Sequence, residues 1–151
     1  MFAYRKAARA AGAAAIAACL AVPASSETVL QASLYVTTVL QDTNENMSNR
    51  GWTIRQGFVG HVDQGSSYSH LIRTDRASRF ILKGYCDTDC DDLDMALLDS
   101  NGRVVLEDVG DDDTPELRFN ANDVRGGTSV RVSMPGCDQQ PCYYSVGLYS
   151  R

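Results

Sequence analysis

The chain has no hydrophobic run long enough to cross a bilayer. Its longest apolar stretch, residues 10–22, covers 13 residues, whereas a membrane-spanning helix needs roughly 20. Three basic residues precede this stretch, and the small residues of Val22–Ala24 end it. This arrangement is typical of a secretory signal peptide. We therefore predict that residues 1–24 are removed by cleavage after Ala24 and that the protein is periplasmic or secreted.

The same segment contains an alternative processing signal. Residues Ile16–Cys19 resemble a bacterial lipobox, in which the cysteine is lipidated and becomes the first residue of the mature chain. This alternative predicts an outer-membrane lipoprotein anchored through Cys19. Both alternatives predict an exported protein, and they differ in where the mature chain begins.

Basic residues are scarce relative to acidic ones. Loss of the signal peptide takes three of the 14 Lys and Arg residues, so 11 remain against 19 Asp and Glu. The mature chain therefore has a net charge of about −8. This charge repels nucleic acid and anionic membrane surfaces, which argues against both as partners.

Histidines and catalytic motifs are also scarce. The chain has two histidines, His61 and His70. It contains no Gly-x-Ser-x-Gly elbow, no His-Glu-x-x-His motif and no phosphate-binding glycine loop. The sequence therefore predicts no catalytic residues, and we expect that the protein is not an enzyme.

One amphipathic helix is predicted at the start of the mature chain, within residues 26–42. Polar residues 44–51 are expected to end it. We therefore predict a helix and loop over residues 25–50, followed by a single domain over residues 51–151. The helix is indicated by five apolar residues at the spacing of one helical face, Val29, Ala32, Val36, Val39 and Leu40.

From Trp52 onward, short runs with a period of two predict β-strands. In one of them, Leu93, Met95 and Leu97 lie on one face, and an Asn-Gly pair after it signals a hairpin. Many short strands separated by turns, with no second helical pattern, predict an all-β fold, an antiparallel β-sandwich. The predicted strands cover residues 57–63, 78–85, 92–99, 104–108, 116–121, 129–134 and 143–150.

The mature chain contains four cysteines in two closely spaced pairs. An even number of cysteines in an exported chain favours two disulfides. The simplest pairing is local, Cys86 with Cys90 and Cys137 with Cys142, although four cysteines allow three connectivities. The spacing also suits structural zinc, but an oxidising compartment argues against that alternative.

Acidic residues are concentrated between Asp87 and Asp113, which hold 11 of the 19 acids with Arg103 as the sole basic residue. Such a density of like charge is unfavourable unless something compensates it, and calcium is the natural candidate. Asp92 and Leu98 stand where an EF-hand has glycine and glutamate, so any site would combine two loops. The alternative is a set of turn and surface residues. The candidate ligands are Asp87, Asp89, Asp91, Asp92, Asp111, Asp112 and Asp113.

Three tyrosines are candidates for a binding surface. Tyr85, Tyr143 and Tyr149 lie on the strand phase opposite to the predicted core residues, so we expect them to be exposed. A β-sandwich face that carries tyrosines is a common platform for sugars or peptides. The alternative is that these rings pack against arginines or cover the end of a sheet.

Residues 57–150 contain a combination of motifs that resembles a known family, the bacterial pre-peptidase C-terminal (PPC) type of domain, in its small stand-alone exported form. The resemblance implies a jelly-roll-like sandwich and accessory rather than catalytic work. Related domains follow peptidases and bind substrate, calcium or the cell surface. We expect no peptidase ahead of this domain, so that role does not carry over. The matching elements are Gly84, Cys86-Asp87-x-Asp89-Cys90, Asp92-Leu93-Asp94, Asp99-x-Asn101-Gly102, Asp112-Asp113-x-Pro115 and Cys137…Pro141-Cys142-Tyr143.

The sequence therefore predicts an exported, non-catalytic binding or structural module, with calcium as a candidate stabilising ligand. Its expected partner is a secreted or envelope protein or a polysaccharide. Two alternatives stay open: a regulator of a secreted hydrolase, either an inhibitor or a folding helper, and a lipid-anchored envelope protein.

Overall fold

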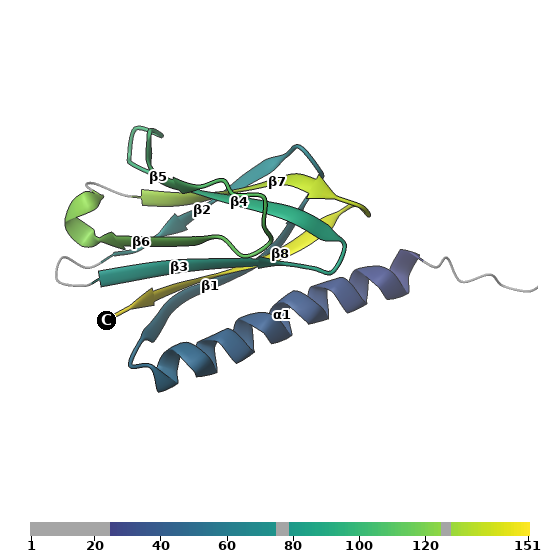
Figure 1. Cartoon of the computed structure of the whole chain (residues 1–151), viewed down its shortest axis with the longest axis horizontal. Coiled ribbons are helices and arrows are strands. Elements are labelled where there is room, and N and C mark those ends of the chain that lie inside the picture. The colour runs from purple at the N-terminus through teal and green to yellow at the C-terminus, as the bar shows by residue number, and fades with distance from the viewer. Residues whose placement is uncertain (1–24, 75–78, 125–127) are drawn as a thin grey trace, which may run out of the picture.

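The computed structural model describes residues 25–74, 79–124 and 128–151. One long helix lies against a sandwich of two antiparallel sheets (Figure 1). The predicted signal peptide, its cleavage site and Cys19 lie outside the described residues. The all-β sandwich with one N-terminal helix that the sequence predicts is confirmed.

Each sheet contains four strands. The first sheet has the order β1-β8-β3-β6, and the second sheet has the order β2-β7-β4-β5. Every strand pair is antiparallel. The elements are α1 (Ser25–Asn49), β1 (Thr53–Val62), β2 (Ser67–Ile72), β3 (Arg79–Cys86), β4 (Cys90–Leu98), β5 (Val104–Asp108), β6 (Glu116–Asn120), a 3₁₀ turn (Ala121–Asp123), β7 (Thr128–Cys137) and β8 (Cys142–Ser150).

The main core lies between the two sheets and follows the predicted alternation. Leu93, Met95 and Leu97 of β4 face Tyr144, Val146 and Leu148 of β8 across one cluster of buried side chains. Burial of alternate side chains from both sheets is what stabilises a sandwich, at roughly 25 cal/mol per Å² of apolar surface removed from water.

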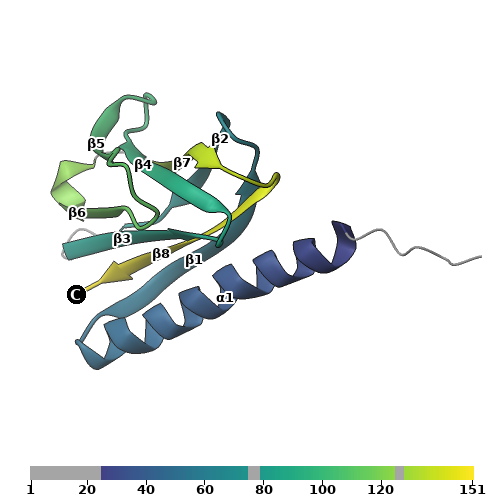
Figure 2. The same ribbon diagram turned by 45° about the vertical axis from the view of Figure 1, so that its right-hand side comes forward.

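Helix α1 covers the outer face of the first sheet, where it packs mainly against β8 and β1 (Figures 1 and 2). Val36, Leu40 and Met47 form its buried stripe. The predicted end of the helix after residue 42 is wrong, because the helix continues to Asn49. Met47, within the polar stretch, is 3% exposed and packs with Ile81 and Tyr149 in a second, smaller core.

Strand β8 lies between the two cores and is buried along its whole length. One phase of its side chains enters the sandwich, and the other faces α1. Gly147 makes this packing possible, because a Cβ there would lie 2.4 Å from the Tyr149 hydroxyl.

Strand β2 was not among the predicted strands. It is an edge strand of serines and exposed residues in which His70 is half-buried and Ile72 alone is buried, so its sequence shows little alternation. No described helix combines the length and the apolar character that crossing a bilayer requires.

Candidate functional site

The two disulfides join the sheets at one end of the sandwich. Cys86 bonds Cys90, linking β3 of the first sheet to β4 of the second, and Cys137 bonds Cys142, linking β7 to β8. The local pairing that the sequence favours is therefore confirmed. The Cα atoms are 5.9 and 6.3 Å apart, a separation that suits a disulfide.

Both disulfide-closed turns belong to one hydrogen-bonded unit. Cys90 and Cys137 are register partners on β4 and β7. The amide of Asp138 in the second turn donates to the carbonyl of Asp89 in the first at 2.8 Å. Because each turn supports the other, this end of the sandwich is fixed as a unit.

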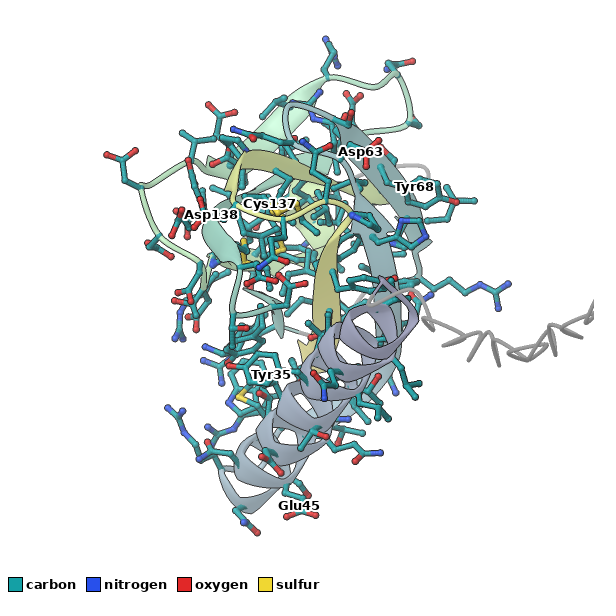
Figure 3. All side chains as sticks on the ribbon, turned by 90° about the vertical axis from the view of Figure 1, so that its right-hand side faces the viewer. Tyr35, Glu45, Asp63, Tyr68, Cys137 and Asp138 are labelled. Atoms are coloured by element: carbon teal, nitrogen blue, oxygen red, sulfur yellow. A yellow bond between two sulfur atoms is a disulfide. The ribbon has the colours of Figure 1, made fainter. Side chains whose placement is uncertain are left out.

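This end is strongly acidic, and we call it the aspartate end. Figure 3 looks onto it, with Asp63 and Asp138 projecting from different loops. Within the described residues, the turns that form it carry no lysine or arginine. Its acidic residues are Asp63, Asp87, Asp89, Asp91, Asp92, Asp111, Asp112, Asp113 and Asp138.

Asp87 is the most buried of these carboxylates, with 4% of its surface exposed. Its Oδ2 accepts a 2.9 Å hydrogen bond from the amide of Tyr143, while its Oδ1 is buried without a hydrogen-bond partner. Burial raises the pKa of the Asp87 carboxyl, and the nearby charge of Asp89 adds to the rise. Asp89 in turn accepts a 3.5 Å hydrogen bond from the Gln139 side chain.

Asp92 belongs to a second group, on the side of the 109–115 loop. Burial raises the pKa of Asp92, and the charges of Asp111 and Asp112 raise it further. Its Oδ1 is buried and also lacks a hydrogen-bond partner. The amide of Leu93 donates to the Asp112 carbonyl at 3.0 Å, which holds this loop against β4.

The predicted calcium ligands therefore fall into two groups, one around Asp87 and Asp89 and one around Asp92, Asp111 and Asp112. Asp91 and Asp113 are exposed. Among the described residues, no three His, Cys, Asp or Glu side chains are grouped as a metal site would need. A cation at either group would have to be completed by carbonyl oxygens or water, as calcium allows.

The expected exposure of the tyrosines is wrong for two of the three. Tyr149 is fully buried, Tyr143 is 9% exposed, and Tyr85 is half-buried. The predicted strand phase is correct, but α1 covers the face onto which Tyr149 points. Burial raises the pKa of Tyr149, and its hydroxyl donates a hydrogen bond to Asn44 of the helix.

The two histidines lie on opposite sides of the first sheet. His61 is exposed beside Tyr143, with ring centroids 5.4 Å apart. His70 reaches from β2 into the sandwich, where its Nε2 lies 2.9 Å from the Tyr144 hydroxyl and its ring stacks on Phe58. Burial lowers the pKa of His70 and raises that of Tyr144 to about 12.

The opposite end of the sandwich carries a feature that the sequence analysis missed, a group of exposed arginines that we call the arginine end. These residues are far apart in the sequence, and only the antiparallel topology brings them together at the end where β1 and β3 begin and β6 and β8 finish. They are Arg50, Arg55, Arg73, Arg79, Arg118 and Arg151.

Neither a protein-family model nor a curated protein sequence matches this chain.

Proposed function

We propose that this chain is an exported, non-catalytic binding or structural module, with a jelly-roll sandwich of the PPC type and calcium as a stabilising ligand. The observation that carries the proposal is the construction of the aspartate end. Two disulfides join both sheets there, and nine aspartates lie in or beside turns that hold no basic residue among those described. A rigid surface of a single charge is suited to binding.

The strand order supports the jelly-roll assignment. Eight antiparallel strands are divided equally between two sheets, and sequence neighbours β1 and β2 lie in different sheets, as do β7 and β8. A jelly roll is a double sheet of eight strands formed from two Greek keys, and the observed order fits this arrangement. The paired cysteines and the acidic turns support the PPC resemblance, and disulfides support export because they persist in oxidising compartments.

Two buried and unpartnered oxygens support calcium. Oδ1 of Asp87 and Oδ1 of Asp92 are shielded from water without a hydrogen bond, and an unsatisfied buried polar atom is costly. A hard cation with several oxygen ligands would satisfy such atoms and offset the repulsion among the carboxylates. Because three acidic side chains are not grouped in either place, we expect binding near 10⁻³ M, as in extracellular calcium modules.

Thermal melting with calcium and with magnesium tests this part of the proposal. A ligand present at ten times its Kd should add about 1.4 kcal/mol to the free energy of unfolding. Asp92→Asn should reduce the effect of calcium, whereas the exposed Asp138→Asn serves as the matched control. Equal shifts with calcium and magnesium would rule out a specific site, and an unchanged effect of calcium in both variants would rule out the group around Asp92.

Crosslinking in the native host, followed by mass spectrometry, tests the binding role. We expect a secreted or envelope component to be captured by the wild-type chain and lost on reduction of the disulfides. Capture of a hydrolase whose activity falls in the complex would instead identify a regulator. A chain that is recovered without any crosslinked component would count against both roles.

A further inference from the structure

A groove at the arginine end has the composition of a ligand site. It has a volume of about 270 Å³ and lies on the outer face of β3 and β6, beside the C-terminal end of α1. This volume is slightly below the range of pockets for drug-sized molecules. The groove therefore suits a single small ring or one residue of a polymer. Its lining includes Trp52, Arg79, Ile81, Arg118 and Asn120.

The sheet register determines how these side chains are arranged. Arg79 pairs with Asn120, and Ile81 pairs with Arg118. Since Phe80 enters the core, alternation places all four of these residues on the opposite face. Arg79 and Arg118 are therefore diagonal neighbours, about 7–8 Å apart, with a somewhat shorter distance between their Cβ atoms.

Two arginines at this spacing favour an anion between them. Like charges on neighbouring strands repel, and an oxyanion that both guanidinium groups contact would remove that repulsion. Arg118 forms an ion pair with Glu116 and still exposes 65% of its side chain. Glu116 also accepts a hydrogen bond from Lys83 at 2.5 Å. Glu116 therefore helps to position Arg118 and leaves its outer donors accessible.

The rest of the groove is apolar and aromatic. Trp52 packs against Met47, Ile81 and Tyr149 in the smaller core while it also lines the groove. An indole that is fixed by packing offers an apolar surface at little cost in conformational entropy. The side-chain amide of Asn120 lies at the edge and bonds Asp123 at 3.2 Å.

We propose that this groove binds a carboxylate-bearing sugar residue of an acidic polysaccharide. The two arginines bind the carboxylate, Trp52 and Ile81 contact the apolar face of the ring, and Asn120 is placed to bond a hydroxyl. Strand β6 is the edge of its sheet, so an acidic peptide could pair with its outer backbone groups. The groove itself lies on the face of the sheet, where the indole of Trp52 and the side chain of Ile81 suit a sugar ring better than an extended peptide. The inference names a ligand class for the binding module proposed above.

The net negative charge of the chain does not prevent this binding at physiological salt. Strand β8, with nine residues, spans about 27 Å between the two ends. The Debye length is about 8 Å at 0.15 M ionic strength. The aspartate end is therefore screened from a ligand at the arginine end, where the nearby charges are the arginines together with Glu116 and Asp123.

The tryptophan provides a direct readout, because Trp52 is the single tryptophan of the chain. We would titrate the intact mature protein with a hexamer of galacturonic acid and follow tryptophan fluorescence at 0.15 M salt, with maltohexaose as the neutral control. We expect saturable binding of the acidic hexamer alone. Replacing both groove arginines, Arg79→Gln with Arg118→Gln, should weaken binding about tenfold or more.

A matched double variant, Arg103→Gln with Arg131→Gln, makes the same change in net charge at residues that are not among the arginines of the arginine end and should leave the affinity unchanged. Equal losses in the two double variants would overturn the groove as the site, as would no fluorescence change with wild type. Equal binding of a poly-glutamate peptide would overturn the choice of a sugar. Circular dichroism confirms that each variant is folded. Calcium melting and crosslinking test the proposed function independently, so either proposal can fail alone.

Discussion

The hydroxyl of Tyr149 donates a 2.7 Å hydrogen bond to Oδ1 of Asn44, joining the central strand β8 to helix α1. The two residues are 105 positions apart in the chain. Their contact closes the smaller core around Met47 and Trp52. It makes the helix a third layer of the domain.

Tyr149→Phe should lower the free energy of unfolding by about 1 kcal/mol, because the ring still fills its site while the hydrogen bond is lost. Asn44 is half-buried, so its freed oxygen can be hydrated. Urea denaturation measures the change. Tyr35→Phe, on the exposed side of the same helix, is the control and should change little. Equal stability of both variants would mean that the bond does not hold the helix.

Asp94→Asn should stabilise the protein at neutral pH by about 0.5 kcal/mol. Burial raises the pKa of Asp94 above its ordinary value of 3.8, with further increases from the charges of Asp92 and Asp108. The folded state therefore binds a proton more readily than the unfolded state.

The destabilising effect of ionised Asp94 is complete above the folded-state pKa and decreases as the pH falls toward 3.8. Melting curves of Asp94→Asn and wild type should therefore converge on acidification. The exposed Asp91→Asn is the matched control. A stability difference that does not depend on pH would contradict this explanation.

His70 should make the free energy of unfolding fall on acidification, which is the opposite of the effect expected from Asp94. Burial holds its pKa below the ordinary value of 6.5, so the folded state keeps the ring neutral while the unfolded chain takes up a proton. The free energy of unfolding should therefore fall as the pH drops from 6.5 through the folded-state pKa. In His70→Gln this part of the pH dependence should disappear, and persistence of the full slope would assign it to another group.

Replacing Cys137 and Cys142 together by serine should lower the free energy of unfolding by about 2 kcal/mol, because a short loop constrains the unfolded chain only modestly. Urea denaturation of oxidised wild type and the double variant measures the difference. Reduced wild type should have a lower free energy of unfolding than the oxidised double variant, because a reductant also opens the bond between Cys86 and Cys90. If reduction left wild type as stable as before, the disulfides would not support the fold.

Much of the sandwich could be predicted from local patterns. Alternation identified Leu93, Met95 and Leu97 as core residues, and the turn after them sets up the hairpin of β4 and β5, whose predicted bounds of 104–108 match β5. The local cysteine pairing followed from short spacing. In each case the determining interaction is between residues near one another in the sequence.

The sequence predictions are wrong where the structure depends on contacts between residues that are far apart in the sequence. Tyr149 and Tyr143 are buried although their strand phase was predicted correctly, because α1 lies over that face of the sheet. The helix runs on to Asn49 through polar residues because Met47 packs on Ile81. The groove between Arg79 and Arg118 arises from the pairing of β3 with β6, which no local pattern reveals.

Intact mass spectrometry of the protein isolated from its native host, without reduction, tests export and disulfide formation in one experiment. We expect a chain that begins at Ser25 and lacks four hydrogen atoms relative to the fully reduced sequence, with no thiol open to alkylation. A chain that begins at Met1 with its cysteines reduced would contradict both the export and the disulfide-joined sandwich.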